Sequence, residues 1–277
     1  MTAKSITDLS RLCIHTITTK PWKIEEAVRH FSASGVYGIT VWRDALEGRN
    51  IRQTGQMLKD AGLEIVSLCR GGFFPSIEKE KRALAIADNR KAIEEAAELG
   101  TAMVVLVCGA EPRQSLEASR KQIEEGIQTL LPLAADAGVK LAIEPLHPMY
   151  ADTRSAINTL GQANDMAEAI NSPWVGIAVD VYHLWWDPTL EQEIKRCGQH
   201  GNLVAFHVCD WNVPTVDMLN DRGLMGEGCI PVPTIRQWVE EAGFRGFNEV
   251  EIFSHKFWKE DQSEFLKKII KAYREKT

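Results

Sequence analysis

Short apolar runs alternate with longer amphipathic stretches along the whole chain. The apolar runs are rich in β-branched side chains and are almost continuously hydrophobic, which is typical of parallel strands that are covered by helices. Eight runs are therefore predicted as strands: residues 11–16, 37–42, 64–69, 103–108, 140–144, 175–180, 203–208 and 248–253.

The stretches between these runs carry helix signals. Residues 21–35 begin with a proline near the first turn and stop at a glycine, and residues 89–100 and 119–138 also end at glycine. A last amphipathic stretch covers residues 261–276. No linker rich in proline, glycine or serine divides the chain. Eight repeats of strand and helix predict a single (β/α)8 TIM barrel, with residues 1–277 as one domain.

Side chains that can bind a metal close four successive runs. Glu144 ends KLAIE, Asp180 ends VGIAVD, and the next two runs, LVAFHV and NEVEIF, contain His207 and Glu251. Because a barrel gathers the carboxyl ends of its strands at one face, we expect the four side chains to converge. Three carboxylates at that separation would repel and raise one another's pKa values, a conflict that a divalent cation removes. The sequence therefore predicts one bound metal ion.

The predicted ligand set is rich in oxygen and contains one nitrogen. It suits Mn²⁺ best and is also compatible with Mg²⁺, Co²⁺ or Zn²⁺. Four protein ligands leave open positions in an octahedral shell, where two substrate oxygens could bind. Each residue alone is weak evidence, because a carboxylate at a strand end is more often a cap and a lone histidine is more often a core residue. The combination of four carries the prediction.

Alternation along the strands supports this arrangement. If the four ligands point inward, their neighbours point outward to the helices, and these are all apolar: Ile143, Val179, Phe206 and Val250. The inward positions below three of the ligands are small: Ala142, Ala178 and Ala205. Glu249 is the exception, since it would face inward one layer below Glu251. We interpret it as part of a salt bridge in the barrel floor, with Lys140 as a candidate partner.

Composition narrows the classes of partner. The 277 residues are 44% hydrophobic and 25% charged, which is an ordinary globular balance. A net charge of -6 without basic runs disfavours nucleic acid and acidic membrane surfaces. No apolar run approaches the roughly 20 residues that span a bilayer, and the N-terminus lacks the apolar stretch of a signal peptide. The six cysteines form no CxxC pair and are interpreted as reduced thiols. We expect a cytoplasmic protein with a small-molecule partner, and leave homo-oligomer formation open.

Five segments resemble the xylose isomerase-like barrels, a superfamily that includes ketose 3-epimerases, hydroxypyruvate isomerases, inosose dehydratases and type IV apurinic endonucleases. The segments are IEPLHP, VDVYH, FHVCDW, DRGLMGEGCI and GFNEVEIF. The resemblance covers essentially the whole chain and is specific for the superfamily, not for one member. It implies that Glu144 and Glu251 bind the metal and also move the proton. It further implies that His183 and Arg222 contact the substrate.

Departures from the superfamily patterns are informative. The apurinic endonucleases bind three zinc ions and need further histidines, one of them in an Asp-Arg-His triplet. This chain has Gly223 at that place, and its third and fourth strands end in Cys69-Arg70 and Cys108-Gly109. The missing imidazoles indicate a site for a single ion. The epimerases usually carry Pro-Gly after the arginine, and Met225 replaces that proline. Glu227, in the same segment, is a candidate for substrate binding.

Further polar and aromatic residues lie at predicted strand ends. His15 and Arg70 are candidates to bind substrate oxygens or a carboxylate. Five aromatic residues are candidates for a pocket wall, or else for a cover of the barrel rim: Trp42, Tyr182, Trp185, Trp186 and Trp211. His147 and Arg154 either orient a ligand residue or form a surface ion pair. Asp210 either supports the metal shell or caps a loop.

These residues suggest chemistry next to a ketone. A divalent ion stabilises the negative charge that develops on the carbonyl oxygen, and a carboxylate within reach can remove the neighbouring proton. We therefore expect a divalent-metal-dependent isomerase or epimerase of keto sugars, which acts through a metal-stabilised enediolate with Glu144 and Glu251 as acid and base. The alternative is a dehydratase of the inosose or 3-dehydroshikimate type on the same barrel. An apurinic endonuclease and a binding protein without turnover are less favoured.

Overall fold

The computed structural model describes residues 6–277 and shows a closed barrel of eight parallel strands in chain order. The barrel strands are β1 Leu12–His15, β2 Gly38–Trp42, β3 Glu64–Gly72, β4 Met103–Val107, β5 Lys140–Glu144, β6 Val175–Asp180, β7 Leu203–Val208 and β10 Asn248–Val250. Every predicted strand is present, and the expectation of a single (β/α)8 barrel is confirmed.

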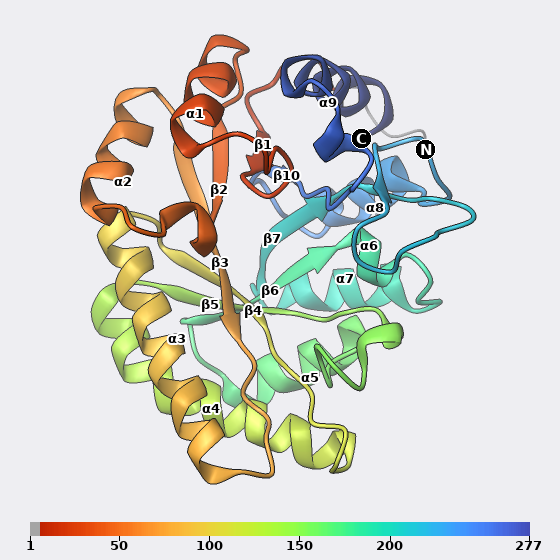
Figure 1. Ribbon diagram of the computed structural model, residues 1–277. Helices are drawn as coiled ribbons and strands as arrows, with labels where there is room; N and C mark the ends of the chain where they lie inside the picture. Colours follow the sequence, from red (N-terminus) through yellow and green to blue (C-terminus); the bar gives the residue numbers. More distant parts are fainter. Residues whose placement is uncertain (1–5) are drawn as a thin grey trace.

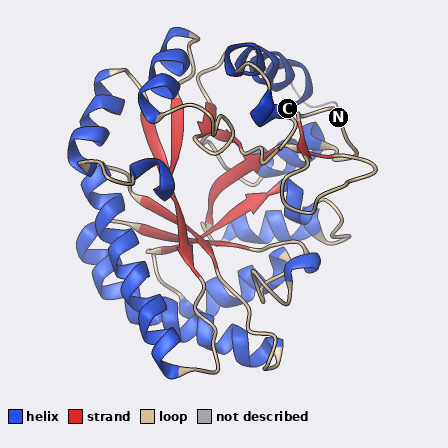
Figure 2. Cartoon of the chain, viewed as in Figure 1, coloured by secondary structure: helices blue, strands red, loops and turns tan. Residues whose placement is uncertain are grey.

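Helices surround the barrel on the outside (Figures 1 and 2). The longer ones are α1 Ile24–Ala33, α2 Ile51–Asp60, α3 Lys79–Leu99, α4 Leu116–Ala137, α5 Leu160–Ile170, α7 Leu190–Gln199, α8 Val232–Glu241 and α9 Gln262–Lys276. Shorter elements lie in the loops: the helix α6 Val181–Leu184, the 3-10 turns η1 Arg43–Leu46, η2 Pro148–Tyr150 and η3 Phe257–Lys259, and the antiparallel pair β8 Asp210–Trp211 and β9 Arg222–Gly223. None of the helices described is long and apolar enough to span a bilayer.

Local sequence signals account for several helix ends. The side chains of Ser115 and Thr159 accept hydrogen bonds from the first turns of α4 and α5, as N-cap residues do. Helices α3 and α4 end where Gly100 and Gly138 adopt left-handed backbone conformations, with φ of 88° and 66°. Because glycine reaches this region without a steric penalty, these predicted ends are confirmed.

The packing around the strands follows the predicted alternation. Ile143, Val179, Phe206 and Val250 belong to the large apolar core that includes the inward faces of the helices. Ala142, Ala178 and Ala205 form a separate cluster with Cys69 and Val105 inside the barrel. The interior is therefore lined by small side chains below the carboxyl ends of β5, β6 and β7. All six cysteines are free, and all except Cys229 are buried.

Strand β3 differs from its predicted bounds, because it continues three residues past Cys69 to Gly72. Its pairing with β4 shifts between Cys69 and Gly71, so the strand contains a bulge at this point. Gly72 has a φ of 110°, and a Cβ atom there would lie 1.9 Å from the carbonyl oxygen of Val107. Only glycine lets the two backbones approach this closely, and the strand extension depends on it.

Candidate metal centre

The four predicted ligand residues lie together at the carboxyl ends of neighbouring strands. Strands β5, β6, β7 and β10 are adjacent in the barrel, and Asp180 pairs in register with His207. One ligand atom from each of the four residues lies within 4.8 Å of the others. All four side chains are buried, and the most exposed of the four residues, Glu144, is 5% accessible. The structure thus brings together the predicted set, whereas the binding of a metal stays a prediction.

Unpaired buried atoms in this cluster fit a cation. Both ring nitrogens of His207 and the Oε1 atom of Glu144 are buried without a hydrogen-bond partner. His207 Nδ1 lies 3.0 Å from that Oε1 atom, but the two do not form a well-directed hydrogen bond. Buried polar atoms without partners are rare because each costs about 1–3 kcal/mol. Three carboxylates and one imidazole are a donor set that Mn²⁺, Mg²⁺, Co²⁺ and Zn²⁺ accept.

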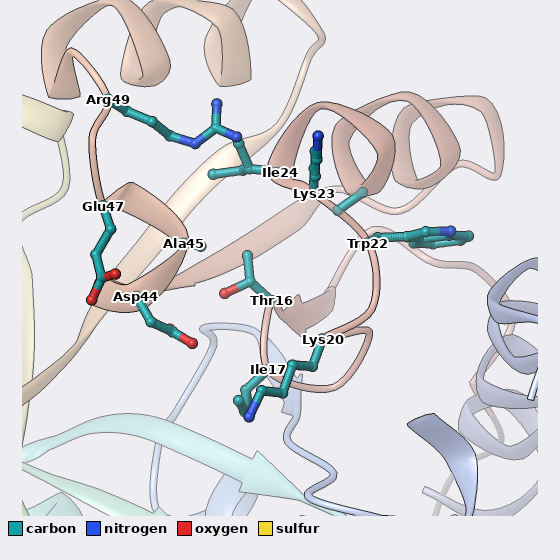
Figure 3. Close-up of a pocket in the computed structure, with 11 residues that line it drawn as sticks. Thr16, Ile17, Lys20, Trp22, Lys23, Ile24, Asp44, Ala45, Glu47 and Arg49 are labelled. Carbon is teal, nitrogen blue, oxygen red and sulfur yellow. The ribbon is translucent and has the colours of Figure 1, made fainter. Parts of the chain in front are cut away.

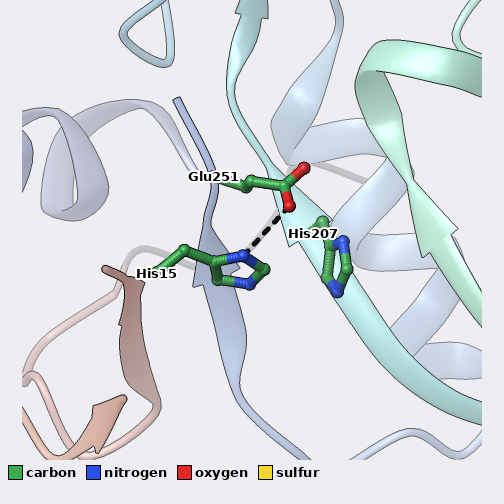
Figure 4. Close-up of side chains that lie close together, drawn as sticks. All are labelled: His15, His207 and Glu251. Atoms are coloured by element: carbon green, nitrogen blue, oxygen red, sulfur yellow. Dashed lines mark ion pairs between the residues drawn. The ribbon is translucent and has the colours of Figure 1, made fainter. Parts of the chain in front are cut away.

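Both ring nitrogens of His15 contact carboxylates of the protein. The Nδ1 atom lies 3.0 Å from Glu251 Oε1 (Figure 4). The Nε2 atom lies 3.1 Å from Glu249 Oε2. Burial opposes a charged ring, but the charges of the two glutamates outweigh it and raise the pKa of His15 to about 9. The charged imidazole therefore holds Glu251 in place from below. The predicted contact of His15 with substrate stays a prediction, and both ring nitrogens are already engaged.

The interpretation of Glu249 needs a correction, because Lys140 is not its partner. The ammonium group of Lys140 contacts the carbonyl oxygen of Pro173 at the opposite end of the barrel, where β5 begins. Glu249 instead accepts a 2.6 Å hydrogen bond from Thr40 and pairs with His15. Burial would raise the pKa of Glu249, but the charges of His207 and His15 lower it. Glu249 therefore supports the layer of ligands directly above it.

Arg222 joins two of the candidate ligands. Its Nη1 atom donates to Asp180 Oδ2 at 3.1 Å and to Glu251 Oε2 at 2.8 Å. Burial raises the pKa of Asp180 to about 7, although Arg222 acts in the opposite direction. At Glu251 burial also favours the neutral form, but Arg222 and His15 hold its pKa well below the usual range. The cluster therefore contains a carboxylate that stays ionised under almost all conditions.

His183 is positioned by the turn after β6. Asp180 accepts a hydrogen bond from the backbone N–H of Tyr182 and so caps α6, which begins at the next residue. One turn later the ring of His183 lies beside Arg222, with Nη2 and Nε2 3.2 Å apart. Burial and the charge of Arg222 keep the pKa of His183 well below its usual value, so the ring is neutral. The structure thus places both predicted substrate contacts next to the candidate ligands.

The predicted aromatic residues form two groups. The indole nitrogen of Trp42 lies 3.3 Å from His15 Nδ1, and its ring contacts Phe253 edge to face at 5.1 Å. On the other side, Trp211 stacks on Tyr182 at 4.7 Å and lies 5.7 Å from Trp185. Trp186 donates its indole N–H to the carbonyl oxygen of His183. Trp42 borders the candidate centre through His15, and the second group borders it through Tyr182 and His183.

Two predicted loop residues, Glu227 and Asp210, lie outside the cluster of candidate ligands. The structure does not bring Glu227 into the cluster: its side chain is 40% exposed, 4.0 Å from Lys256. Asp210 accepts hydrogen bonds from the backbone N–H groups of Trp211, Gly226 and Ile230, which agrees with loop capping and not with a place in the metal shell.

Within residues 6–277, His147 and Arg154 do not form the surface ion pair that was one expectation for them. The ring of His147 lies 5.0 Å from Trp211, and its backbone N–H donates to His183. The guanidinium groups of Arg70 and Arg154 lie over the rings of Phe73 and Tyr150. Thr40, the partner of Glu249, was not predicted from the sequence. A polar residue within the apolar strand β2 was the signal that could have indicated it.

A cavity of about 270 Å³ opens beside the cluster, between the loops that follow β1 and β2 (Figure 3). Thr16, the residue after His15, contributes to its wall. Its charged lining consists of Lys20, Lys23, Asp44, Glu47 and Arg49. None of the four candidate ligands lines this cavity, so it is a separate polar hollow at the same face of the barrel.

The comparison with protein families agrees with the architecture. Residues 28–273 match the model of the family described as xylose isomerase-like TIM barrel. The chain belongs to this family. The expected resemblance is thereby confirmed, and it covers most of the chain.

Individual relatives include enzymes that act on sugars. The chain is 24% identical over 243 residues to 3-dehydro-D-guloside 4-epimerase from Escherichia coli K12, which covers 82% of this chain and 86% of that one. Other curated relatives are also named as isomerases or epimerases. These names confirm the expectation of an enzyme and support its coarse kind, an isomerase or epimerase.

Solved structures show the same fold. The protein SMc04130 from Sinorhizobium meliloti 1021 is 45% identical, with a TM-score of 0.93 over 96% of this chain and 98% of that one. The IolI protein, solved with a bound zinc atom, is 20% identical, with a TM-score of 0.83 over 95% of this chain and 96% of that one. At that identity, the second likeness shows the fold alone.

Proposed function

We propose that the protein is a divalent-metal-dependent isomerase or epimerase of keto sugars. The observation that carries this proposal is the pair of buried glutamates, Glu144 and Glu251, at the two ends of one row of candidate ligands. Strands β6 and β7, with Asp180 and His207, lie between them. Relatives named as epimerases and isomerases support the same kind of reaction.

Glu144, Asp180, His207 and Glu251 would hold the metal. Mn²⁺ is the ion that we propose, because the donor set is rich in oxygen; Mg²⁺, Co²⁺ and Zn²⁺ remain compatible with it, and zinc is the ion found in IolI. A bound divalent cation would act as a Lewis acid toward a carbonyl oxygen, which is worth several kcal/mol in the transition state.

The two glutamates supply the proton chemistry. One carboxylate removes the proton from the carbon next to the ketone, and the electron pair of that C–H bond enters the double bond of an enediolate. The other glutamate, in its acid form, returns a proton to the opposite face, which inverts the carbon. Return to the adjacent carbon would interconvert a ketose and an aldose. A positioned acid or base of this kind typically contributes 10²- to 10⁴-fold.

The surrounding residues would orient the sugar. Arg222 and the neutral ring of His183 lie side by side and can share hydrogen bonds with hydroxyl or carbonyl oxygens. Trp42 offers an aromatic edge at the same mouth. We also propose that the substrate is a small sugar or polyol derivative, since the net charge of -6 disfavours anionic polymers. The six free cysteines support our proposal that the protein acts in the cytoplasm, where thiols stay reduced.

Solvent exchange tests the proposal. Protein loaded with Mn²⁺ is incubated in deuterium oxide with a panel of keto sugars, and recovered sugar is examined by mass spectrometry and NMR. We expect one deuterium next to the ketone and the appearance of an epimer or isomer. A product that absorbs in the ultraviolet would instead indicate loss of water. Absence of both exchange and conversion across the panel would contradict the proposal.

Metal analysis of the purified protein provides an independent measurement. We expect about one ion per chain, because the described residues contain one cluster of this kind together with the overlapping group of His15, His207 and Glu251. About three ions per chain would favour the endonuclease type of site.

A further inference from the structure

Arg70 lies in the bulge of β3, near the carboxyl end of the strand. Leu68 packs in the outer core and Cys69 in the barrel interior, so strict alternation would place Arg70 outward and Gly71 inward. Gly71 in fact faces outward, because a Cβ atom there would lie 2.5 Å from the side chain of Asn89 on α3. Arg70 is thus the extra residue of the bulge, which is the position from which bulges at barrel rims commonly redirect a side chain.

Arg154 reaches the same region from the loop after β5. Its carbonyl oxygen accepts a 2.8 Å hydrogen bond from Gly109. A Cβ atom on Gly109 would lie 2.6 Å from the Cα atom of Phe73, so these three backbone segments are in contact. The loop that carries Arg154 therefore lies directly beside the end of the strand that carries Arg70.

Both guanidinium groups lie over aromatic rings of one cluster. Arg70 lies 4.3 Å from the ring centre of Phe73, and Arg154 lies 5.6 Å from that of Tyr150. Phe73 and Tyr150 pack in the same small apolar group. Tyr150 in turn contacts the ring of His183 at 5.8 Å. The two cations therefore share a platform that adjoins the candidate active site.

No carboxylate within residues 6–277 pairs with either arginine, although both are half-buried. Other arginines of the chain are paired: Arg43, Arg113 and Arg196 each lie within 2.7 Å of a carboxylate oxygen. Burial and the charge of Arg154 lower the pKa of Arg70; Arg43 acts in the same direction, and the charge of Asp88 on α3 opposes it without forming an ion pair. A partly desolvated pair of like charges is unfavourable unless an anion joins it.

We infer that Arg70 and Arg154 form a binding site for an oxyanion of the substrate, a phosphate ester or a carboxylate. The guanidinium fork matches both groups, because each presents two oxygens to two parallel N–H donors. This inference rests on the proposed function, in which the ketone end of the same substrate lies at Glu144 and Glu251. The substrate class is then an anionic keto sugar, held by its charged end at the rim of β3 and β5.

Binding of unreactive polyols tests this site without any turnover. Ribitol, ribitol 5-phosphate and ribonate are titrated calorimetrically into the Mn²⁺-loaded protein. We expect at least one anionic polyol to bind 10-fold or more tightly than ribitol, and the stronger of the two identifies the oxyanion. Arg70→Gln and Arg154→Gln should each weaken its binding about 10- to 100-fold and leave ribitol unaffected.

Arg52→Gln is the matched control, because the side chain of Arg52 is 81% exposed on α2 and its nearest carboxylate oxygen is 4.0 Å away. It should bind all three polyols as the unaltered protein does. Arg70→Lys keeps the positive charge but loses the guanidinium fork, so its affinity for the anionic polyol should lie between those of Arg70→Gln and the unaltered protein.

Equal affinity for all three polyols, or unchanged anion binding in both glutamine variants, would overturn the inference while leaving exchange of neutral keto sugars intact. Anion binding that depends on both arginines, without any solvent exchange, would overturn the proposed function alone.

Discussion

Glu251 shows how much of the candidate site depends on single contacts. One carboxylate oxygen lies beside His15 and the other accepts from Arg222, so the side chain has one orientation. Both partners are cationic, which is why the pKa of Glu251 stays low despite its burial. A glutamate held in this way is ready to bind a cation and to act in proton transfer without first losing a proton.

Replacing Glu251 by glutamine should therefore abolish most turnover. The amide keeps the shape of the side chain but can neither accept the proton nor contribute a negative charge, so we expect kcat to fall about 10²- to 10⁴-fold. The measurement is the rate of deuterium exchange into the keto sugar.

Glu227→Gln is the matched control for this variant. The same chemical change then falls on a 40% exposed side chain outside the cluster, and activity should stay within about 2-fold. Substantial exchange by Glu251→Gln would contradict the two-glutamate mechanism. A comparable loss in Glu227→Gln would show that this loop residue also acts in the reaction.

Among the elements, the loops after β3 and β4 are joined by one buried carboxylate. Glu111 forms a two-pronged pair with Arg113, with N–O distances of 2.8 and 2.7 Å. It also accepts from the backbone of Ile77 and the hydroxyl of Ser76, just before α3. The hydrogen bond of Arg113 lowers the pKa of Glu111 to about 2. The loop that precedes α4 is thus attached to the one that precedes α3.

Glu111→Gln should lower the free energy of unfolding near pH 7 in a pH-dependent way. The folded-state pKa is depressed from 4.5 to about 2, so the stabilisation is present above about pH 4.5 and is lost as the pH falls toward 2. In urea denaturation the difference between the two proteins should therefore shrink between pH 7 and pH 3.

Glu98→Gln serves as the control for the acid series. Glu98 is exposed and lies 4.0 Å from an exposed Arg52, so its replacement should change stability by less than about 0.5 kcal/mol at either pH. A difference for Glu111→Gln that is the same at pH 7 and pH 3 would show that the ionised pair does not stabilise the two loops.

At the scale of the whole molecule, the candidate centre joins strands from one side of the barrel to β1 and β2. Thr40 on β2 and His15 on β1 bind Glu249, which lies one layer below the ligands supplied by β5, β6 and β7. The charges of this network are balanced only in part, because four carboxylates face Arg222 and two imidazoles. A bound cation would reduce their repulsion and so stabilise the entire barrel.

Removal of metal should therefore lower the thermal midpoint. At a free Mn²⁺ concentration 100 times the dissociation constant, the ion adds about 2.7 kcal/mol to the free energy of unfolding. For a chain of this length that corresponds to about 5 °C in calorimetry. Chelation should reverse the shift, and readdition of Mn²⁺ should restore it. A midpoint that is identical with and without the ion would argue against the centre.

The strands, the barrel and the set of four candidate ligands could all be predicted from the amino-acid sequence. These features depend on local patterns, because successive side chains of a strand point to opposite faces. Ile143 faces outward into the core and the next residue, Glu144, faces inward to the cluster. The superfamily motifs added His183 and Arg222, which the structure places beside the ligands. The alternation along the strands and the superfamily motifs can both be recognised without knowing which distant segments are in contact.

The contacts between residues far apart in the chain could not be predicted and follow from the fold. Glu249 contacts Thr40, which is 209 positions away in the chain, and not Lys140. Glu249 pairs in register with His207 near the carboxyl end of β7, whereas Lys140 is the first residue of β5. Arg70 is left unpaired because a bulge interrupts the register of β3 with β4. Glu227 lies outside the site because Asp210 binds the backbone of its loop. Contacts of this kind depend on register and on backbone approach across the barrel, which no pattern of neighbouring residues contains.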